Sequence, residues 1–91
     1  MTHNKLEKYR QKIDVIDATI VKLLAKRMLT VKRIGKYKKR HGIDIVQEDR
    51  WEQVLKRIKR LGERTEVLDE EFIEAIWNEI HEFSKRSQSS S

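Results

Sequence analysis

Large hydrophobic residues recur at alternating spacings of three and four along the first forty residues. This spacing places them on one face of a helix, because an α-helix completes a turn every 3.6 residues. The face comprises Leu6, Tyr9, Ile13, Ile16, Ile20, Leu23, Ile34 and Tyr37. Two polar residues, Arg27 and Thr30, interrupt this face, although burying a cation without a partner is costly. We therefore predict that the face borders a charged pocket as well as another helix.

The pattern predicts an all-α protein with one very long N-terminal helix followed by two shorter helices. The long helix should run from about Asn4, which can serve as its N-cap, to about Arg40, with Gly42 as its stop. Because the chain has no proline and three glycines, few residues break the helical runs.

The two shorter helices occupy the second half of the chain. The second helix should begin near 47–49 and end at Leu61, with Gly62 as its stop. The third should open at Asp69 as its N-cap, with acidic residues in its first turn. We treat residues 1–91 as a single domain with a core at about 4–88 and a disordered tail at 89–91.

The third helix repeats the polar interruption of the first. Its apolar residues Ile73, Trp77 and Ile80 lead on the same face into Ser84 and Gln88. Residues four apart face the same way on a helix, so Ser84 and Gln88 should look into one space.

The length of the first helix favours a homodimer. A helix of about 36 residues is roughly 54 Å long, whereas a compact chain of this size is only about 30 Å across. The apolar face continues along the overhang and needs a cover. Two long helices paired in an intertwined helical homodimer provide that cover.

Charge is distributed unevenly along the chain. Residues 1–41 contain 13 Lys or Arg and 3 Asp or Glu. Residues 42–91 contain 8 Lys or Arg and 12 Asp or Glu. A basic half attracts anions such as nucleic acid, anionic lipid, or a small polycarboxylate or phosphate. No run of about 18 apolar residues predicts a membrane span. The sequence has no cysteine and no secretory signal, which fits a cytoplasmic protein.

Helical geometry assembles several cations into one cage. Lys38 follows Arg27 by eleven residues and returns to within about 20° of the same direction. Arg10 points about 100° away from Arg27 and lies roughly 25 Å along the axis, so it could reach only a partner's pocket. Arg50 stands at the start of the second helix. Such a cage suits a small dianion.

The histidines do not predict a metal site. His3, His41 and His81 are far apart and lack the spacing of metal ligands. We interpret them as exposed or helix-end residues. The cage also offers no obvious nucleophile–base pair, because the chain has no cysteine and we expect no histidine near a serine on the same face.

The chain resembles the all-helical chorismate mutases over about residues 4–88. The matching segments are Tyr9–Asp17, Leu24–Arg27, Ile34–Lys38, Asp49–Arg50 and Glu82–Gln88. The segment Val46–Glu52 is most similar to mutase domains fused to an aromatic-pathway synthase. The resemblance implies a homodimer with two active sites and a possible synthase partner or fusion.

By motif position, the resemblance also implies roles for individual residues. Arg10, donated by the partner chain, and Arg27 would bind substrate carboxylates, and Ser84 would support one of them. Lys38 and Gln88 would flank the ether oxygen, with Arg50 in the same site. The implied reaction is the [3,3] rearrangement of chorismate to prephenate, which needs orientation and charge stabilisation and no cofactor.

The sequence departs from the family pattern near the second helix. Trp51 occupies the position of a common glutamate that contacts the substrate's ring hydroxyl, and Gln47 stands where an aspartate is common. Gln47, Glu48 or Glu52 could replace that contact. The ring substituent of the substrate, in chorismate, isochorismate or an amino analogue, therefore stays open, and Trp51 can also be read as a packing residue.

Two other functions are compatible with parts of the pattern. An isochorismate pyruvate lyase would have a similar fold and cationic cage. Its products, salicylate and pyruvate, would distinguish it from a mutase. A basic helical module that binds nucleic acid would explain the positive half. However, Arg27 lies in the apolar face, and the sequence shows no recognised nucleic-acid motif, so we expect no nucleic-acid partner.

Overall fold

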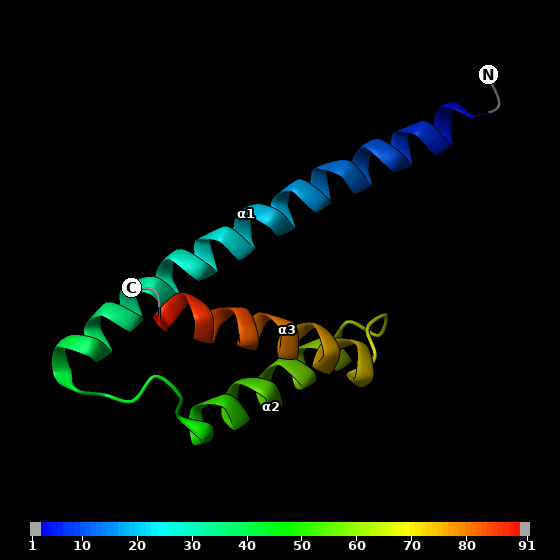
Figure 1. Cartoon of the computed structure of the whole chain (residues 1–91). Helices are drawn as coiled ribbons and strands as arrows, with labels where there is room; N and C mark the ends of the chain where they lie inside the picture. Colours follow the sequence, from blue (N-terminus) through cyan, green and yellow to red (C-terminus); the bar gives the residue numbers. More distant parts are fainter. Residues whose placement is uncertain (1–2, 90–91) are drawn as a thin grey trace. The chain divides into compact units, whose positions relative to one another are not determined.

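Three helices account for most of the chain in the computed structural model, which describes residues 3–89 (Figure 1). They are α1 (Asn4–His41), α2 (Glu48–Arg64) and α3 (Glu70–Ser89). The described residues contain no strand, which confirms the predicted all-α class with one long and two shorter helices. The chain divides into two compact units, Met1–Thr30 and Val31–Ser91.

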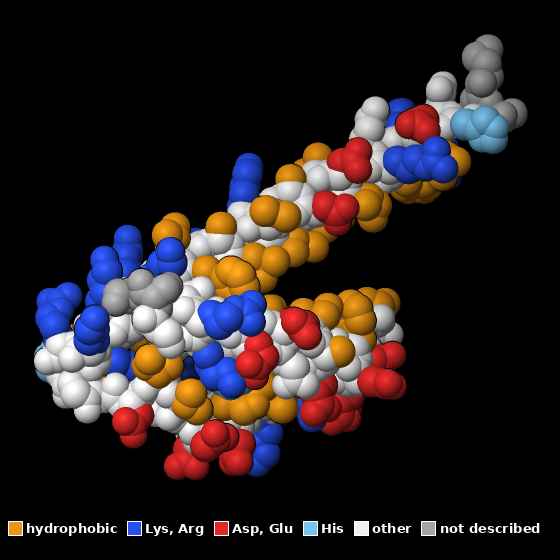
Figure 2. Space-filling view, viewed as in Figure 1, with side chains coloured by type: hydrophobic (Ala, Val, Ile, Leu, Met, Phe, Trp, Pro, Cys, Tyr) orange, Lys and Arg blue, Asp and Glu red, His pale blue; other side chains and the backbone are white. Residues whose placement is uncertain are grey.

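The first unit consists of the N-terminal part of α1. The amide of Glu7 donates to the carbonyl of His3, so His3 is the N-cap and the prediction of Asn4 was wrong by one residue. Large hydrophobic side chains lie exposed along this helix (Figure 2). Thr30, one of the polar interruptions, donates its hydroxyl to the carbonyl of Lys26 at 3.0 Å. The helix itself therefore satisfies that hydroxyl.

The second unit contains the end of α1 and the α2–α3 hairpin. In Figure 1, α2 and α3 lie side by side and antiparallel, joined by a short connection. The buried apolar side chains of this unit are few: they are Val31, Val54, Ile73 and Ile80. They come from all three helices, so the core lies among the helices of this unit.

The predicted stop of α1 is confirmed at Gly42. Its φ of 62° lies in the left-handed region, which glycine adopts without a steric penalty. The amide of Ile43 then donates to the carbonyl of Lys38 at 2.9 Å, the long-range bond of a Schellman motif. The cap turns the chain towards α2.

Gly62 does not end α2, contrary to the prediction. The helix continues to Arg64, and Gly62 is buried where α3 crosses it. A Cβ at this position would lie 2.7 Å from Cγ1 of Ile73. The glycine permits close helix packing, whereas Thr65 follows as the C-cap, with its hydroxyl donating to the carbonyl of Gly62 at 2.6 Å.

The start of α3 is confirmed at Asp69. One carboxylate oxygen of Asp69 accepts a hydrogen bond from the amide of Phe72 at 2.8 Å, as an N-cap should. At the other end, Ser89 is the last residue of α3, although the predicted tail began there. Residues 90–91 of that tail lie outside the described residues.

Gly35 allows α1 and α3 to approach one another within the second unit. It is buried, and a Cβ there would lie 2.7 Å from the carbonyl oxygen of Gln88 and 2.9 Å from its Cα. Those atoms belong to the backbone of a helix and cannot move independently. The glycine that weakens α1 locally is therefore required for its contact with α3.

Gly35→Ala should lower the free energy of unfolding by about 1–3 kcal/mol, because the overlap with α3 outweighs the gain of about 1 kcal/mol in helix propensity. Urea denaturation followed by circular dichroism measures the change. Lys36→Ala, at the exposed neighbouring position, is the matched control and should be near neutral. A Gly35→Ala variant as stable as the parent would contradict the close approach.

Candidate active site

Lys38 links three segments of the second unit. Its Nζ donates to Oε1 of Gln88 in α3 at 2.9 Å and to the carbonyl of Ile45, in the α1–α2 connection, at 2.7 Å. The structure thus brings together two residues to which the resemblance assigned neighbouring roles. An ammonium only donates, so Oε1 of Gln88 faces Lys38 and the amide Nε2–H₂ remains the donor end of that side chain.

The charge of Lys38 has neutral partners. Among the described residues, no carboxylate forms an ion pair with it, and both of its acceptors are uncharged oxygens. Partial burial removes water from the ammonium and lowers the pKa of Lys38 from the ordinary lysine value. A half-buried cation that forms no ion pair among the described side chains is suited to an anionic ligand.

Ser84 occupies the same face of α3 as Gln88, one turn earlier. It is buried, and its hydroxyl donates to the carbonyl of Ile80 at 2.6 Å. That hydrogen bond satisfies its proton within the helix. To donate to a substrate carboxylate, the hydroxyl would rotate away from Ile80, which a single rotatable bond allows.

Trp51 packs against His81. The indole and imidazole rings are stacked with centroids 3.9 Å apart and an angle of 10° between their planes. Both side chains are half-buried, so the interpretation of His81 as an exposed or helix-end residue was wrong. His81 precedes Ser84 by three and Gln88 by seven residues, and this helical spacing was the signal that could have placed it on the same face.

Arg50 and Gln47 line a shallow depression at the start of α2. It has a volume of about 530 Å³ and is open to solvent, and acidic side chains share its lining. Its lining residues are Asp44, Val46, Gln47, Glu48, Asp49, Arg50 and Gln53. Arg50 and Gln47 therefore line the same depression, at the end of the hairpin that carries Trp51, and their part in a substrate site stays a prediction.

Arg10 and Arg27 belong to the first unit. Arg10 is exposed and forms an ion pair with Glu7 at 3.0 Å, one turn earlier on the same helix. Arg27 is half-buried in the predicted apolar face. Their participation in a pocket with Lys38 stays a prediction.

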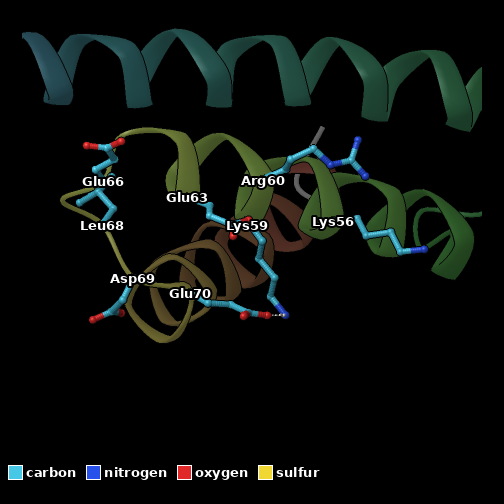
Figure 3. Close-up of a pocket in the computed structure, with 8 residues that line it drawn as sticks. All are labelled: Lys56, Lys59, Arg60, Glu63, Glu66, Leu68, Asp69 and Glu70. Carbon is cyan, nitrogen blue, oxygen red and sulfur yellow. Dashed lines mark ion pairs between the residues drawn. The ribbon is translucent and has the colours of Figure 1, made fainter.

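A separate cavity of about 570 Å³ lies where α2 ends and α3 begins (Figure 3). Charged side chains of both signs line it, and none of the predicted site residues takes part. Lys59 spans the two helices through ion pairs with Glu74 at 3.2 Å and Glu70 at 3.3 Å. The carboxylate of Glu74, and to a smaller extent that of Glu70, raises the pKa of Lys59. Carboxylates already neutralise the cation there, whereas Lys38 forms no ion pair within residues 3–89.

Within residues 3–89, no group of three or more His, Asp or Glu side chains is placed to hold a metal ion. None of the helices in the described part of the chain is both long and apolar enough to span a bilayer.

Comparison with known proteins identifies the class. The family model for chorismate mutase type II matches residues 9–89. The chain belongs to the chorismate mutase type II family and is an enzyme, an intramolecular isomerase. A 4-amino-4-deoxychorismate mutase from Streptomyces venezuelae is 31% identical over 77 residues, covering 85% of this chain and 74% of that protein. Neither match favours the lyase or the nucleic-acid-binding module.

Lys38→Met should loosen the α1–α2 connection, because it removes the hydrogen bond from Nζ to the carbonyl of Ile45. Hydrogen exchange followed by mass spectrometry should show faster exchange across residues 43–47, since charge-assisted bonds are among the stronger local restraints. Lys39→Met, at the exposed next residue, is the control. Equal exchange in both variants would rule out the restraint.

Proposed function

We propose that this enzyme converts chorismate to prephenate in a cationic pocket centred on Lys38 and Gln88. The observation that carries the proposal is the hydrogen bond between these two side chains. It joins a cation that has no carboxylate partner within residues 3–89 to an amide whose N–H₂ group remains the donor end. The two groups can donate to one oxygen between them.

The reaction requires this combination. In the [3,3] rearrangement, the ether C–O bond breaks as a new C–C bond forms, without proton transfer or a covalent enzyme intermediate. Negative charge grows on the ether oxygen in the transition state. The Lys38 ammonium and the Gln88 amide stabilise that charge at little reorganisation cost, since the contacts with Ile45 and with one another already orient them.

The remaining cations bind and fold the dianion. Arg27, Arg50 and the Arg10 of a partner chain hold the two carboxylates, with Ser84 supporting one of them. These contacts select the compact pseudo-diaxial conformation, which places the two reacting carbons near one another. Their part in the site is supported by their positions in the family's motifs.

The exposed face of α1 supports a homodimer. The large apolar side chains on the predicted face of the first unit are 42–60% exposed in the single chain. They are Leu6, Tyr9, Ile13, Ile16, Ile20 and Leu23. An apolar face of this extent marks an interaction surface, and a second copy of the chain would cover it and bring its Arg10 into the neighbouring site.

The domain extent, the cellular location and a partner protein also belong to the proposal. We take residues 1–91 as one mutase domain acting in the cytoplasm, in aromatic biosynthesis. The absence of cysteine supports that location. An aromatic-pathway synthase, fused or free, is a partner that the Val46–Glu52 segment favours.

A second candidate substrate is 4-amino-4-deoxychorismate. The Streptomyces venezuelae relative carries that compound in its name, and Trp51 and Gln47 leave the ring end of the proposed pocket without the usual carboxylates. Assaying the purified protein with each compound tests both candidates. Preferential turnover of chorismate supports the first, and preferential turnover of the amino compound supports the second.

Lys38→Ala and Arg27→Ala should each lower kcat/KM for chorismate by at least about 100-fold, because each removes a cation that contacts the substrate dianion. Steady-state loss of chorismate absorbance measures the effect. Lys39→Ala and Lys26→Ala remove neighbouring exposed cations and should retain most activity. Near-parental rates for Lys38→Ala would reject the proposed centre.

Arg10→Ala protein mixed with Lys38→Ala protein should recover activity after subunit exchange. In a mixed dimer, one site has both residues and the other has neither, so about half the sites of the heterodimer are complete. The test requires heterodimers isolated with two affinity tags. If isolated heterodimers remain inactive, Arg10 does not act across the interface.

Gln88→Glu should convert a nearly flat acidic pH profile into a steep one. A carboxylate cannot donate to the ether oxygen, so the variant should be poor at pH 7 and recover below about pH 5, where it protonates. Lys38 lies 2.9 Å from the native amide and lowers the pKa of the new acid, which moves recovery towards lower pH. Parental activity of this variant at pH 8 would place Gln88 away from the breaking bond.

A further inference from the structure

The first turn of α2 carries Arg50 and has no side-chain N-cap. Its N-cap residue, Gln47, makes no side-chain hydrogen bond to the helix, although such a bond normally stabilises a helix start. Glu48, Asp49 and Arg50 are all exposed. Trp51 is the first residue of α2 that is partly buried. The position of this turn therefore depends on what Trp51 contacts.

Trp51 contacts the imidazole of His81. The rings are nearly parallel and 3.9 Å apart, a geometry with a large shared surface for two flat side chains. His81 stands on the face of α3 that also carries Ser84 and Gln88, and Gln88 is hydrogen-bonded to Lys38. The stack thus joins the start of α2 to the helix face that holds the Lys38–Gln88 pair.

We propose that His81 is a positioning residue, which anchors the first turn of α2 through its stack on Trp51. The anchored turn holds Arg50 at a fixed position relative to the Lys38–Gln88 pair. Losing the stack frays a turn that has no side-chain cap. Arg50 then samples more positions and binds a carboxylate less well. This inference rests on the proposed function for its kinetic consequences, although the anchoring itself does not.

The first test is structural and independent of catalysis. In the full-length protein, His81→Leu should speed hydrogen exchange of the amides at residues 51–54, the first of which donates to the carbonyl of Gln47 at 3.2 Å. His81→Phe restores a flat ring and should restore the slow exchange. Unchanged exchange in His81→Leu would overturn the anchoring role. His81→Gln replaces His81→Leu if the latter fails to fold.

The second test is kinetic. His81→Leu should raise KM for chorismate about three- to tenfold, the range that an aromatic stack contributes, with kcat changed by less than about twofold. His81→Phe should return KM to within about twofold of the parent. A merely structural role would lower the active fraction and kcat while leaving KM constant, and that result would overturn the proposal.

Two controls test whether His81→Leu changes KM through Arg50. In an Arg50→Ala background, His81→Leu should change KM by less than about twofold, because a residue that acts through Arg50 has no further effect once Arg50 is gone. If the effects of His81→Leu and Arg50→Ala on KM are additive, His81 does not act through Arg50 and the proposal is overturned. His41→Leu breaks the other histidine stack, that of His41 on Tyr37 with centroids 4.1 Å apart, and should leave KM unchanged. An equal rise in this control would show a general effect of losing a stack.

The kinetic and structural arms separate the two proposals. A protein that converts neither chorismate nor the amino compound refutes the proposed function. The exchange data then still decide whether His81 anchors α2.

Discussion

The hydrogen bonds of Lys38 are the interactions on which the candidate site depends. One ammonium connects α1, the α1–α2 connection and α3 through the carbonyl of Ile45 and the amide of Gln88. Because both acceptors are neutral, the cation is held in place without losing its ability to attract an anion. A carboxylate in either position would have fixed Lys38 equally well, but it would have neutralised the charge, as Glu70 and Glu74 neutralise Lys59.

The close packing of α1 and α3 supports this arrangement. Gly35 lies against the backbone of Gln88, the residue whose side chain accepts from Lys38. The small residue in α1 therefore sets the separation of the helices, and that separation sets the length of the hydrogen bond one turn further along. A glycine that appears unfavourable for a helix is retained where two backbones must approach. Packing and electrostatics are coupled at this point of the fold.

The ring end of the proposed pocket differs in character from the end at the breaking bond. Trp51 stacks on His81, so this region offers aromatic surface. A hydroxyl and an amino substituent differ mainly in their charge and hydrogen-bonding needs. In the proposed pocket, which has no carboxylate at position 51, discrimination between them would depend on the shape of the stack and on the exposed polar residues of the neighbouring turn, among them Gln47.

Local sequence determined the helices, two of their boundaries and the faces they present. The three–four spacing, the left-handed Gly42 and the capping carboxylate of Asp69 all act within a few residues, so the sequence alone was enough to predict them. The same spacing put Ser84 and Gln88 on one face. The reaction was predicted from the resemblance to a family, because the periodicity of the helices does not identify a reaction.

Only the tertiary structure decided which residues meet across helices. Gly62 reads as a helix stop, yet it lies within α2 because Ile73 packs against it. His81 reads as a surface residue, yet it stacks on Trp51, thirty positions away in the chain. The bond from Lys38 to Ile45 likewise depends on the path of the connection. Such contacts depend on the separation and rotation of packed helices, which periodicity along one helix does not specify.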